Sequence, residues 1–229
     1  MSNLSPDVNT VNRSAASVTR ASDSPSRSSY RHGDLRNALI DAGVELAAGG
    51  GPGAVVLREA TRRAGVSPNA AYRHFADREA LLAAVSLRSL GLVGAEITAE
   101  LSACAGGTDV RAQLDAVGRA YVHFALREPG LFRTAFSVHT DPEAGRGAEG
   151  GGLGPFGLLL AVLDRAVEQG VLPADRRPGA EVAAWASVHG LAVLLLDGPL
   201  RSVPQDAREP LVEAVLATVR DGLFGPEPR

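Results

Sequence analysis

The stretch L-R-E-A-T-R-R-A-G-V-S-P-N-A-A-Y-R-H-F-A-D-R-E-A-L-L, residues 57–82, decides the fold that we predict for this chain. It predicts two short helices, over 57–64 and 68–75, joined by a tight turn that contains glycine. Ser67 is a favourable N-cap residue, and Pro68 fits the first helical position, where its missing N–H costs nothing. Two short helices joined in this way are typical of a helix-turn-helix.

Helices are also predicted on both sides of this stretch. Apolar residues at helical spacing predict a helix from about Asp34 to the glycine- and proline-rich run at 49–53. Asp77 is expected to cap a long helix that ends near Leu101. Five further helices are predicted, over about 109–127, 129–137, 156–169, 179–196 and 206–224. No segment shows sustained alternation of apolar and polar residues, so the predicted fold class is all-α: a three-helix helix-turn-helix domain joined to a larger helical domain.

The composition excludes several classes of protein. The chain has 229 residues, of which 45% are hydrophobic and 21% charged, as in an ordinary soluble globular protein. Its single cysteine, Cys104, excludes an internal disulfide framework and a thiolate zinc site, and so indicates a reducing compartment. The longest uncharged apolar run, 182–196, is shorter than the ~20 residues needed to span a bilayer, and no secretory signal is evident. We therefore expect a cytoplasmic protein with no membrane partner.

Charge and polarity divide the chain into unequal parts. Residues 1–29 contain nine serines and almost no large apolar side chains, so a disordered tail is predicted there. All 23 basic residues are arginine. Up to Arg88 there are 11 arginines against 8 acidic residues, whereas from Ser89 there are 12 against 18. The net charge of -3 is therefore the sum of a mildly basic N-terminal part and an acidic C-terminal part.

Side chains around the second short helix have the chemistry that DNA recognition needs. Asn69 can make a bidentate contact to adenine, and the methyl group of Ala70 can pack against the methyl group of thymine. Tyr72, His74 and Arg78 suit phosphate oxygens, and such contacts would set position and not sequence preference. The alternative is that each is an ordinary solvated or packing residue.

These motifs together resemble one family. The turn A-G-V-S, the segment Y-R-H-F at 72–75 and the segment D-R-E-A-L-L at 77–82 are similar, in order and spacing, to the DNA-binding domain of the tetracycline-repressor (TetR) family of bacterial transcriptional regulators. A second resemblance starts at Trp185, continues with His189-Gly190 and a leucine run, and is similar to the tryptophan-histidine-glycine (WHG) regulatory domain of some TetR-like proteins.

The resemblance implies a domain organisation and partners. It implies a helix-turn-helix DNA-binding domain over 30–88 and a helical regulatory and dimerisation domain over 89–225, after the tail at 1–29. Its partners would be double-stranded operator DNA with a palindromic sequence, an unknown small-molecule effector, and a second copy of the chain bound through the last two helices. No cofactor, metal or catalytic residue is implied.

The resemblance also selects candidate site residues. For DNA binding they are Arg58, Ser67, Pro68, Asn69, Ala70, Tyr72, Arg73, His74 and Arg78. For ligand binding we select polar or aromatic side chains that stand among aliphatic residues: His123, Phe136, Trp185 and His189. Each of the latter can instead be a core residue, and the Trp185–Gly190 region can instead pack two helices closely at the dimer interface.

The sequence departs from the family pattern at three positions. Val56 stands where a Ser or Thr cap is frequent, so the second helix is expected to begin differently. Arg78 replaces a frequent Lys, which keeps the charge and changes its geometry. Ala70 replaces a frequent Thr and removes one hydrogen-bonding group.

Three functions are compatible with these observations. The first is a ligand-responsive transcriptional repressor. The second is an enzyme or ligand-binding activity in the helical half with a vestigial helix-turn-helix, although no metal-ligand spacing, nucleophile elbow or phosphate-binding glycine loop is found. The third is a nucleic-acid-associated interaction protein that senses no ligand. An apolar cavity with a few converging polar groups would favour the first.

Overall fold

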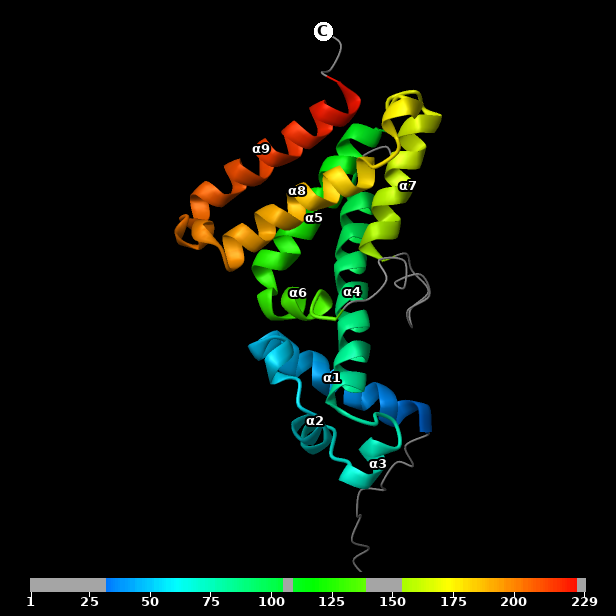
Figure 1. Ribbon diagram of the computed structural model, residues 1–229, viewed down its shortest axis with the longest axis vertical. Helices are drawn as coiled ribbons and strands as arrows, with labels where there is room; N and C mark the ends of the chain where they lie inside the picture. Colours follow the sequence, from blue (N-terminus) through cyan, green and yellow to red (C-terminus); the bar gives the residue numbers. More distant parts are fainter. Residues whose placement is uncertain (1–31, 105–108, 139–153, 226–229) are drawn as a thin grey trace, which may run out of the picture. The chain divides into compact units, whose positions relative to one another are not determined.

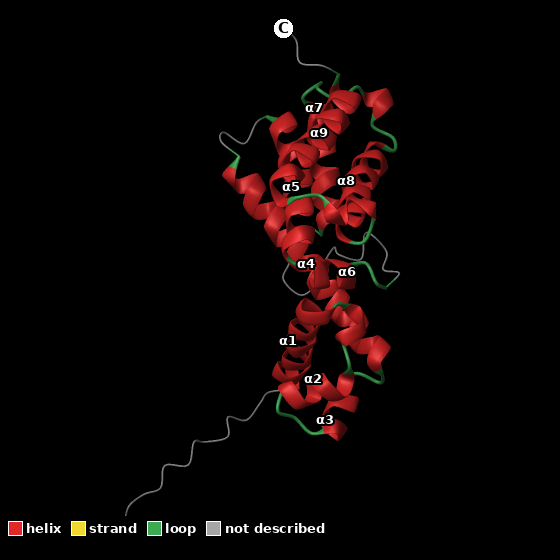
Figure 2. Cartoon of the chain, turned by 90° about the vertical axis from the view of Figure 1, so that its left-hand side faces the viewer, coloured by secondary structure: helices red, strands yellow, loops and turns green. Residues whose placement is uncertain are grey.

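The computed structural model describes residues 32–104, 109–138 and 154–225, and these contain helices and no strand (Figures 1 and 2). The all-α fold class is therefore confirmed. The predicted disordered tail, 1–29, lies outside the described residues.

The described part of the chain contains nine α-helices and three short 3-10 turns. In chain order they are α1 (His32–Gly50), η1 (Pro52–Ala54), α2 (Leu57–Arg63), α3 (Pro68–Tyr72), α4 (Arg78–Ala103), α5 (Val110–Arg127), α6 (Pro129–Ala135), α7 (Pro155–Glu168), η2 (Ala174–Arg176), α8 (Ala180–Leu196), η3 (Pro199–Ser202) and α9 (Gln205–Phe224).

Helices α1 to α4 share a small core. Leu39 of α1, Ala71 of α3 and Leu81 of α4 are fully buried, and Phe75, which follows α3, is nearly so. The guanidinium of Arg36 lies over the Phe75 ring, 5.5 Å from its centre. Burial of Ala71 and Phe75 on one side of α3 leaves the opposite side of this helix to the solvent.

Helix α4 connects this small core with the rest of the protein. It packs against α1 near its start and against α5, α6 and α7 farther along (Figure 1). Among the described helices, α4 alone is long and apolar enough to meet the length and composition test for a membrane span. Its Val85, Val93 and Ile97 are completely buried against other helices, so its apolar character is explained by its place in the core.

Helix α5 is the centre of the second half of the fold. It packs against α4, α6, α7, α8 and α9, and most of its residues are buried. Helix α6 joins the two halves: Ser86 of α4 donates a hydrogen bond of 3.0 Å to the carbonyl oxygen of Ala135. Gly130 of α6 lies so close to α1 that an added Cβ would be 2.2 Å from the carbonyl oxygen of Ala47.

Candidate nucleic-acid interface and ligand cavity

The turn between α2 and α3 is built by local backbone chemistry. Gly65 has a φ of 67°, a conformation that glycine adopts without strain. The N–H of Val66 donates to the carbonyl oxygen of Thr61 at 3.2 Å, which closes the end of α2. Ser67 then caps α3, because its Oγ accepts from the N–H of Ala70 at 3.3 Å. The predicted helix-turn-helix and its serine cap are present.

The predicted cap of the long helix is also present, whereas α2 lacks one. Asp77 accepts from the N–H of Ala80 at 2.8 Å through its Oδ1. Val56 occupies the N-cap position of α2 and offers no side-chain hydrogen bond. Helix α2 nevertheless begins at Leu57, as predicted, since the burial of Leu57 and Ala60 holds it against the core.

The outer side of α3 carries most of the candidate DNA-binding residues. Asn69, Tyr72 and Arg73 are exposed, and Tyr72 is 60% exposed although its ring is large and apolar. Ser67 and Pro68 are exposed, and Ala70 and His74 are half-buried. Within the described part of the chain, the side chains of Asn69, Tyr72, Arg73 and His74 form no hydrogen bond or ion pair. Their polar groups are thus available to an outside partner.

The arginines near α3 differ in what they bind. Arg58 of α2 is exposed and has no ion pair among the described residues. Arg62 donates to Glu59 at 2.6 Å, and this hydrogen bond is the main reason that the pKa of Glu59 is lowered to about 2. Arg78 donates to the carbonyl oxygen of Pro52 at 2.7 Å and so ties the start of α4 to η1.

A cavity of about 210 Å³ lies among α4, α5, α6, α7, α8 and α9. Its wall is mainly aliphatic and aromatic. The residues that line it are Leu90, Ile97, Leu114, Asp115, Val117, Gly118, Tyr121, Ala135, Phe136, Val138, Gly154, Pro155, Phe156, Leu159, Ala184, Trp185, Val188, Leu216 and Val219. Because Leu90 and Ile97 belong to α4, a molecule in this cavity would touch the helix whose first turn follows the helix-turn-helix.

Two polar aromatic side chains of the wall are joined in a hydrogen-bonded chain. The indole N–H of Trp185 donates to the phenol oxygen of Tyr121 at 3.1 Å. That oxygen lies 2.8 Å from Nδ1 of His189. Since the indole can only donate, the phenol proton stays available and can donate to Nδ1 when that nitrogen carries no proton. Burial lowers the pKa of His189, which favours the neutral ring, and burial raises the pKa of Tyr121.

The four predicted ligand-binding residues are not all brought together. Phe136 and Trp185 line the cavity. His189 contacts their rings, with centroids 5.1 and 5.9 Å away, but it is not one of the lining residues. His123 lies elsewhere, at the outer side of α5, where its Nε2 is 2.8 Å from Oε2 of Glu209 in α9.

Sequence reasoning missed three lining residues of chemical interest: Asp115, Tyr121 and Phe156. In the sequence, Asp115 looks like a charged helix residue that faces the solvent. The spacing could have shown that Tyr121 belongs to the cavity-facing side of α5. Leu114, Gly118 and Tyr121 recur at intervals of three and four, as the residues of one helix face do.

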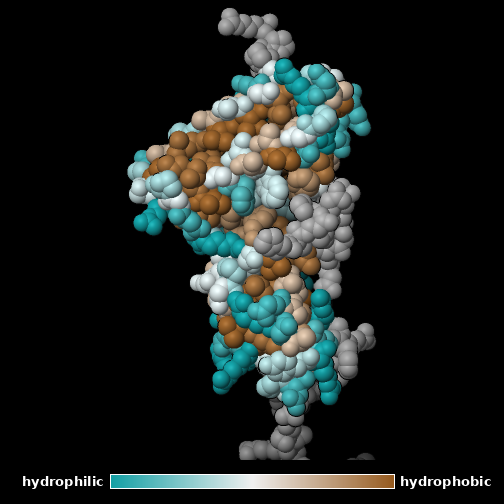
Figure 3. Space-filling view, in the orientation of Figure 1, coloured by the Kyte–Doolittle hydropathy of each residue, from teal (hydrophilic) through white to brown (hydrophobic). Residues whose placement is uncertain are grey.

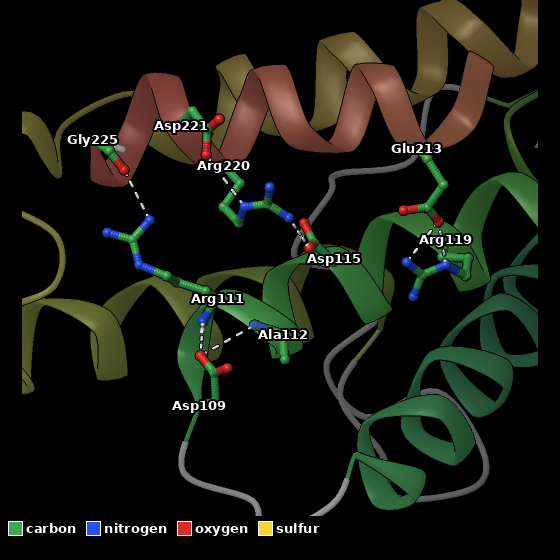
Figure 4. Close-up of polar contacts among 9 residues, drawn as sticks. All are labelled: Asp109, Arg111, Ala112, Asp115, Arg119, Glu213, Arg220, Asp221 and Gly225. Atoms are coloured by element: carbon green, nitrogen blue, oxygen red, sulfur yellow. Dashed lines mark hydrogen bonds and ion pairs between the residues drawn. The ribbon is translucent and has the colours of Figure 1, made fainter. Parts of the chain in front are cut away.

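A row of polar contacts joins α5 to α9 (Figure 4). Arg111 donates to the carbonyl oxygen of Gly225 at 2.9 Å. Asp115 pairs with Arg220 through Oδ2, and Arg119 pairs with Glu213 at 2.6 Å. The other carboxylate oxygen of Asp115, Oδ1, is buried and has no hydrogen-bond partner. Burial raises the pKa of Asp115 despite the nearby arginines.

Two family models match the chain. One, described as "Bacterial regulatory proteins, tetR family", matches residues 39–85. The other, described as "Tetracyclin repressor-like, C-terminal domain", matches residues 114–219. Together they span more than half of the chain. No curated protein sequence matches it.

Solved structures share the fold. A protein with unknown function from Rhodococcus sp. RHA1 is 27% identical, with a TM-score of 0.68 over 86% of this chain and 98% of that chain. A TetR family transcription regulator from Marinobacter aquaeolei VT8 is 22% identical, with a TM-score of 0.59 over 82% and 95% of the two chains. A TetR-family transcriptional regulator from Pectobacterium atrosepticum is 22% identical, with a TM-score of 0.60 over 86% and 97%.

Proposed function

The chain belongs to the tetR family of bacterial regulatory proteins and is a DNA-binding transcription regulator, and from this premise we propose that it is a ligand-responsive repressor that binds a palindromic operator as a homodimer. One observation carries the proposal. Helix α4 is continuous: its first turn follows the helix-turn-helix, whose α3 carries the unpartnered side chains, and farther along its Leu90 and Ile97 line the cavity. No catalytic residue, cofactor or metal takes part, and the protein acts in the cytoplasm, where its DNA lies.

In this proposal residues 30–88 form the DNA-binding domain and 89–225 the regulatory and dimerisation domain. Helix α3 enters the major groove, with Asn69 and its neighbours Pro68 and Ala70 facing base edges. Ser67, Tyr72, Arg73 and His74 face the sugar-phosphate backbone, together with Arg58 of α2. Arg78 would make two contacts. One of its nitrogen atoms donates to Pro52, and its other nitrogen atoms are left for a phosphate.

The proposed dimer forms through α8 and α9. Helix α8 is mostly apolar, and its Val182, Val193 and Leu194 are 58%, 40% and 42% exposed. Figure 3 shows hydrophobic surface over α8 and α9. A contiguous apolar surface of this kind favours association, and two-fold symmetry lets the same surface serve both copies. Such a dimer would present two α3 helices to the two half-sites of a palindrome.

The ligand would act through the population of two states. A molecule in the cavity touches Leu90 and Ile97 of α4, so a shift of α4 would move α3. A ligand releases DNA only if it binds the DNA-incompetent state more tightly than the competent one. Bound DNA must then lower the affinity for the ligand by the same factor.

The first experiment is selection of binding sites from random duplexes by the full chain, followed by gel shift. We expect enrichment of a palindrome. Tyr72→Ala and Arg58→Ala should each weaken DNA binding about tenfold or more, because each removes a contact to the sugar-phosphate backbone without changing the protein core. Arg176→Ala is the matched control, since Arg176 is exposed in η2 and carries the same charge; it should bind as the parent does.

Two results would contradict the proposal. One is the failure to enrich any palindrome. The other is unchanged affinity in both Tyr72→Ala and Arg58→Ala, measured for variants whose circular dichroism matches that of the parent.

A further inference from the structure

The cavity wall contains few polar side chains, and nearly all their hydrogen-bonding groups are already used. Among its lining residues only Asp115, Tyr121 and Trp185 carry a polar side chain. Trp185 donates to Tyr121, and Tyr121 is also bonded to His189. The donors of the aromatic pair are therefore already engaged, and Asp115 is the remaining polar side chain.

Asp115 has one satisfied and one unsatisfied oxygen. Oδ2 is paired with Arg220 of α9 (Figure 4). Oδ1 is buried without a donor, and it is the only such side-chain atom found in the described part of the chain. A buried acceptor without a donor is unfavourable, the more so when it carries charge. The raised pKa of Asp115, caused mainly by burial, agrees with a carboxylate that lacks full stabilisation.

The surrounding charges indicate what kind of donor fits. Arg220 neutralises Asp115, and the neighbouring Arg119 is paired with Glu213 at 2.6 Å. Arg220 also pairs with Asp221 at 3.3 Å, and a cation at Oδ1 would meet the field of Arg220, which holds the other oxygen of the same carboxylate. A neutral O–H or N–H group satisfies Oδ1 without this repulsion.

The size and the walls of the cavity set the rest of the ligand. An apolar cavity of about 150 Å³ in a protein core holds benzene, and the volume here is about 210 Å³. Phe136, Phe156 and Trp185 supply aromatic faces, and the Phe156 and Trp185 ring centroids are 5.5 Å apart. An apolar ring compound, one or two rings in size, fits this space.

We propose that the cavity selects a small, neutral, ring-containing ligand that donates one hydrogen bond from an O–H or N–H group to Oδ1 of Asp115. The inference rests on the proposed ligand-responsive function, and it adds the chemical class of the ligand and the residue that selects it. Because Asp115 is held by Arg220, the ligand would also engage the contact between α5 and α9.

Three near-isosteric probes test this selection: indole, which has an N–H donor, indene, which has no polar atom, and benzofuran, which has an acceptor. Calorimetric titration of the full chain should give a dissociation constant for indole at least about tenfold below those of indene and benzofuran. The same order should hold for 2-naphthol against 2-methylnaphthalene. Equal affinities, tighter binding of indene or benzofuran, or no binding of indole or 2-naphthol at millimolar concentration would overturn the inference.

Asp115→Asn gives a sharper test. Its single amide oxygen should stay with Arg220, so that the amide NH₂ faces the cavity and the preference changes to benzofuran over indole. Glu213→Gln is the matched control, because it removes a carboxylate of the same α5–α9 row that does not line the cavity; it should keep the order of the parent. A folded Asp115→Asn variant with the parent order would overturn the inference, and if this variant does not fold the probe series of the parent decides.

Gel shifts with the selected operator separate this inference from the proposed function. If indole binds with the expected preference and operator affinity stays constant, the cavity selects donors but does not regulate DNA binding. If cavity ligands release the operator without any preference for donors, the ligand-responsive function stands and the role of Asp115 is wrong.

Discussion

A single histidine shows how burial acts at the residue scale. His189 touches the rings of Phe132, Phe136 and Trp185, and its Nδ1 faces the phenol of Tyr121. A protonated ring would carry a proton on Nδ1 and could not accept from the phenol. The pKa of His189 is lowered below its ordinary value of 6.5, and the cause is burial.

From this direction of the pKa shift we predict acid sensitivity. Below pH 6.5 the unfolded chain binds a proton at His189 that the folded chain does not, so the free energy of unfolding should fall as the pH is lowered from 6.5 toward the folded pKa. One group contributes at most about 1.4 kcal/mol per pH unit, and this partly exposed ring contributes less. Urea unfolding between pH 7.5 and 5 measures the slope.

His189→Asn isolates this contribution, because its side-chain oxygen can still accept from Tyr121 and it does not titrate. The variant should lose less stability than the parent between pH 6.5 and 5. The same exchange at His74, which follows α3 and is not among the residues that contact His189, serves as the control. A His189→Asn variant with the acid slope of the parent would show that His189 is not the responsible group.

At the residue scale, the sequence predicts which side chains could bind a ligand better than it predicts where those side chains lie. It selected Phe136 and Trp185, which line the cavity, but it also selected His123, whose ring pairs with Glu209 outside the cavity. Helical periodicity tells which residues share a face, not which neighbouring helix that face meets. Asp115 was missed for the same reason, since its burial depends on where α9 lies.

At the element scale, the close packing of α6 against α1 depends on the absence of a side chain at Gly130. A Cβ on Gly130 would lie 2.2 Å from the carbonyl oxygen of Ala47 and 2.6 Å from that of Ala48. Both are backbone atoms at the end of α1 and cannot turn aside. We predict that Gly130→Ala separates α6 from α1 and lowers the free energy of unfolding by about 1–3 kcal/mol, the usual cost of overpacking.

Gly91→Ala is the matched control in α4, where an added Cβ meets nothing within 4 Å. Because alanine is the better helix former, this variant should be more stable by about 0.5–1 kcal/mol. Chemical denaturation of both variants measures the difference. Equal stability of Gly130→Ala and the parent would mean that α6 does not pack against α1 as described.

The helices themselves were largely predictable, because their signals are local. The caps at Ser67 and Asp77 and the starts of α2 and α3 follow from residues next to each other in the chain. The predicted second helix of the helix-turn-helix was too long, since α3 ends at Tyr72 and a turn follows. The 3-10 turns η1, η2 and η3 were not predicted, because three- and four-residue turns carry no periodicity.

At the scale of the whole molecule, the exposed apolar side of α8 has no explanation within one chain. Its residues are too apolar for a solvated surface, and the inner side of the helix, with Val188, Leu191 and Leu195, already packs against the core. The polar row between α5 and α9 fixes α9 alongside α5 (Figure 4). Both helices of the proposed interface are therefore held in place before a second copy arrives.

The exposed side of α8 should carry the contact between the two copies. Leu194→Glu places a charge on the exposed side of α8, where Leu194 is 42% exposed, so a single chain should tolerate it while a dimer would have to bury the carboxylate. We expect sedimentation to change from dimer to monomer and operator affinity to fall at least about tenfold, because a monomer contacts one half-site. Leu92→Glu is the matched control, since Leu92 of α4 is 37% exposed, and it should stay dimeric. A parent protein that sediments as a monomer, or a Leu194→Glu variant that remains a dimer with unchanged operator affinity, would place the interface elsewhere or remove it.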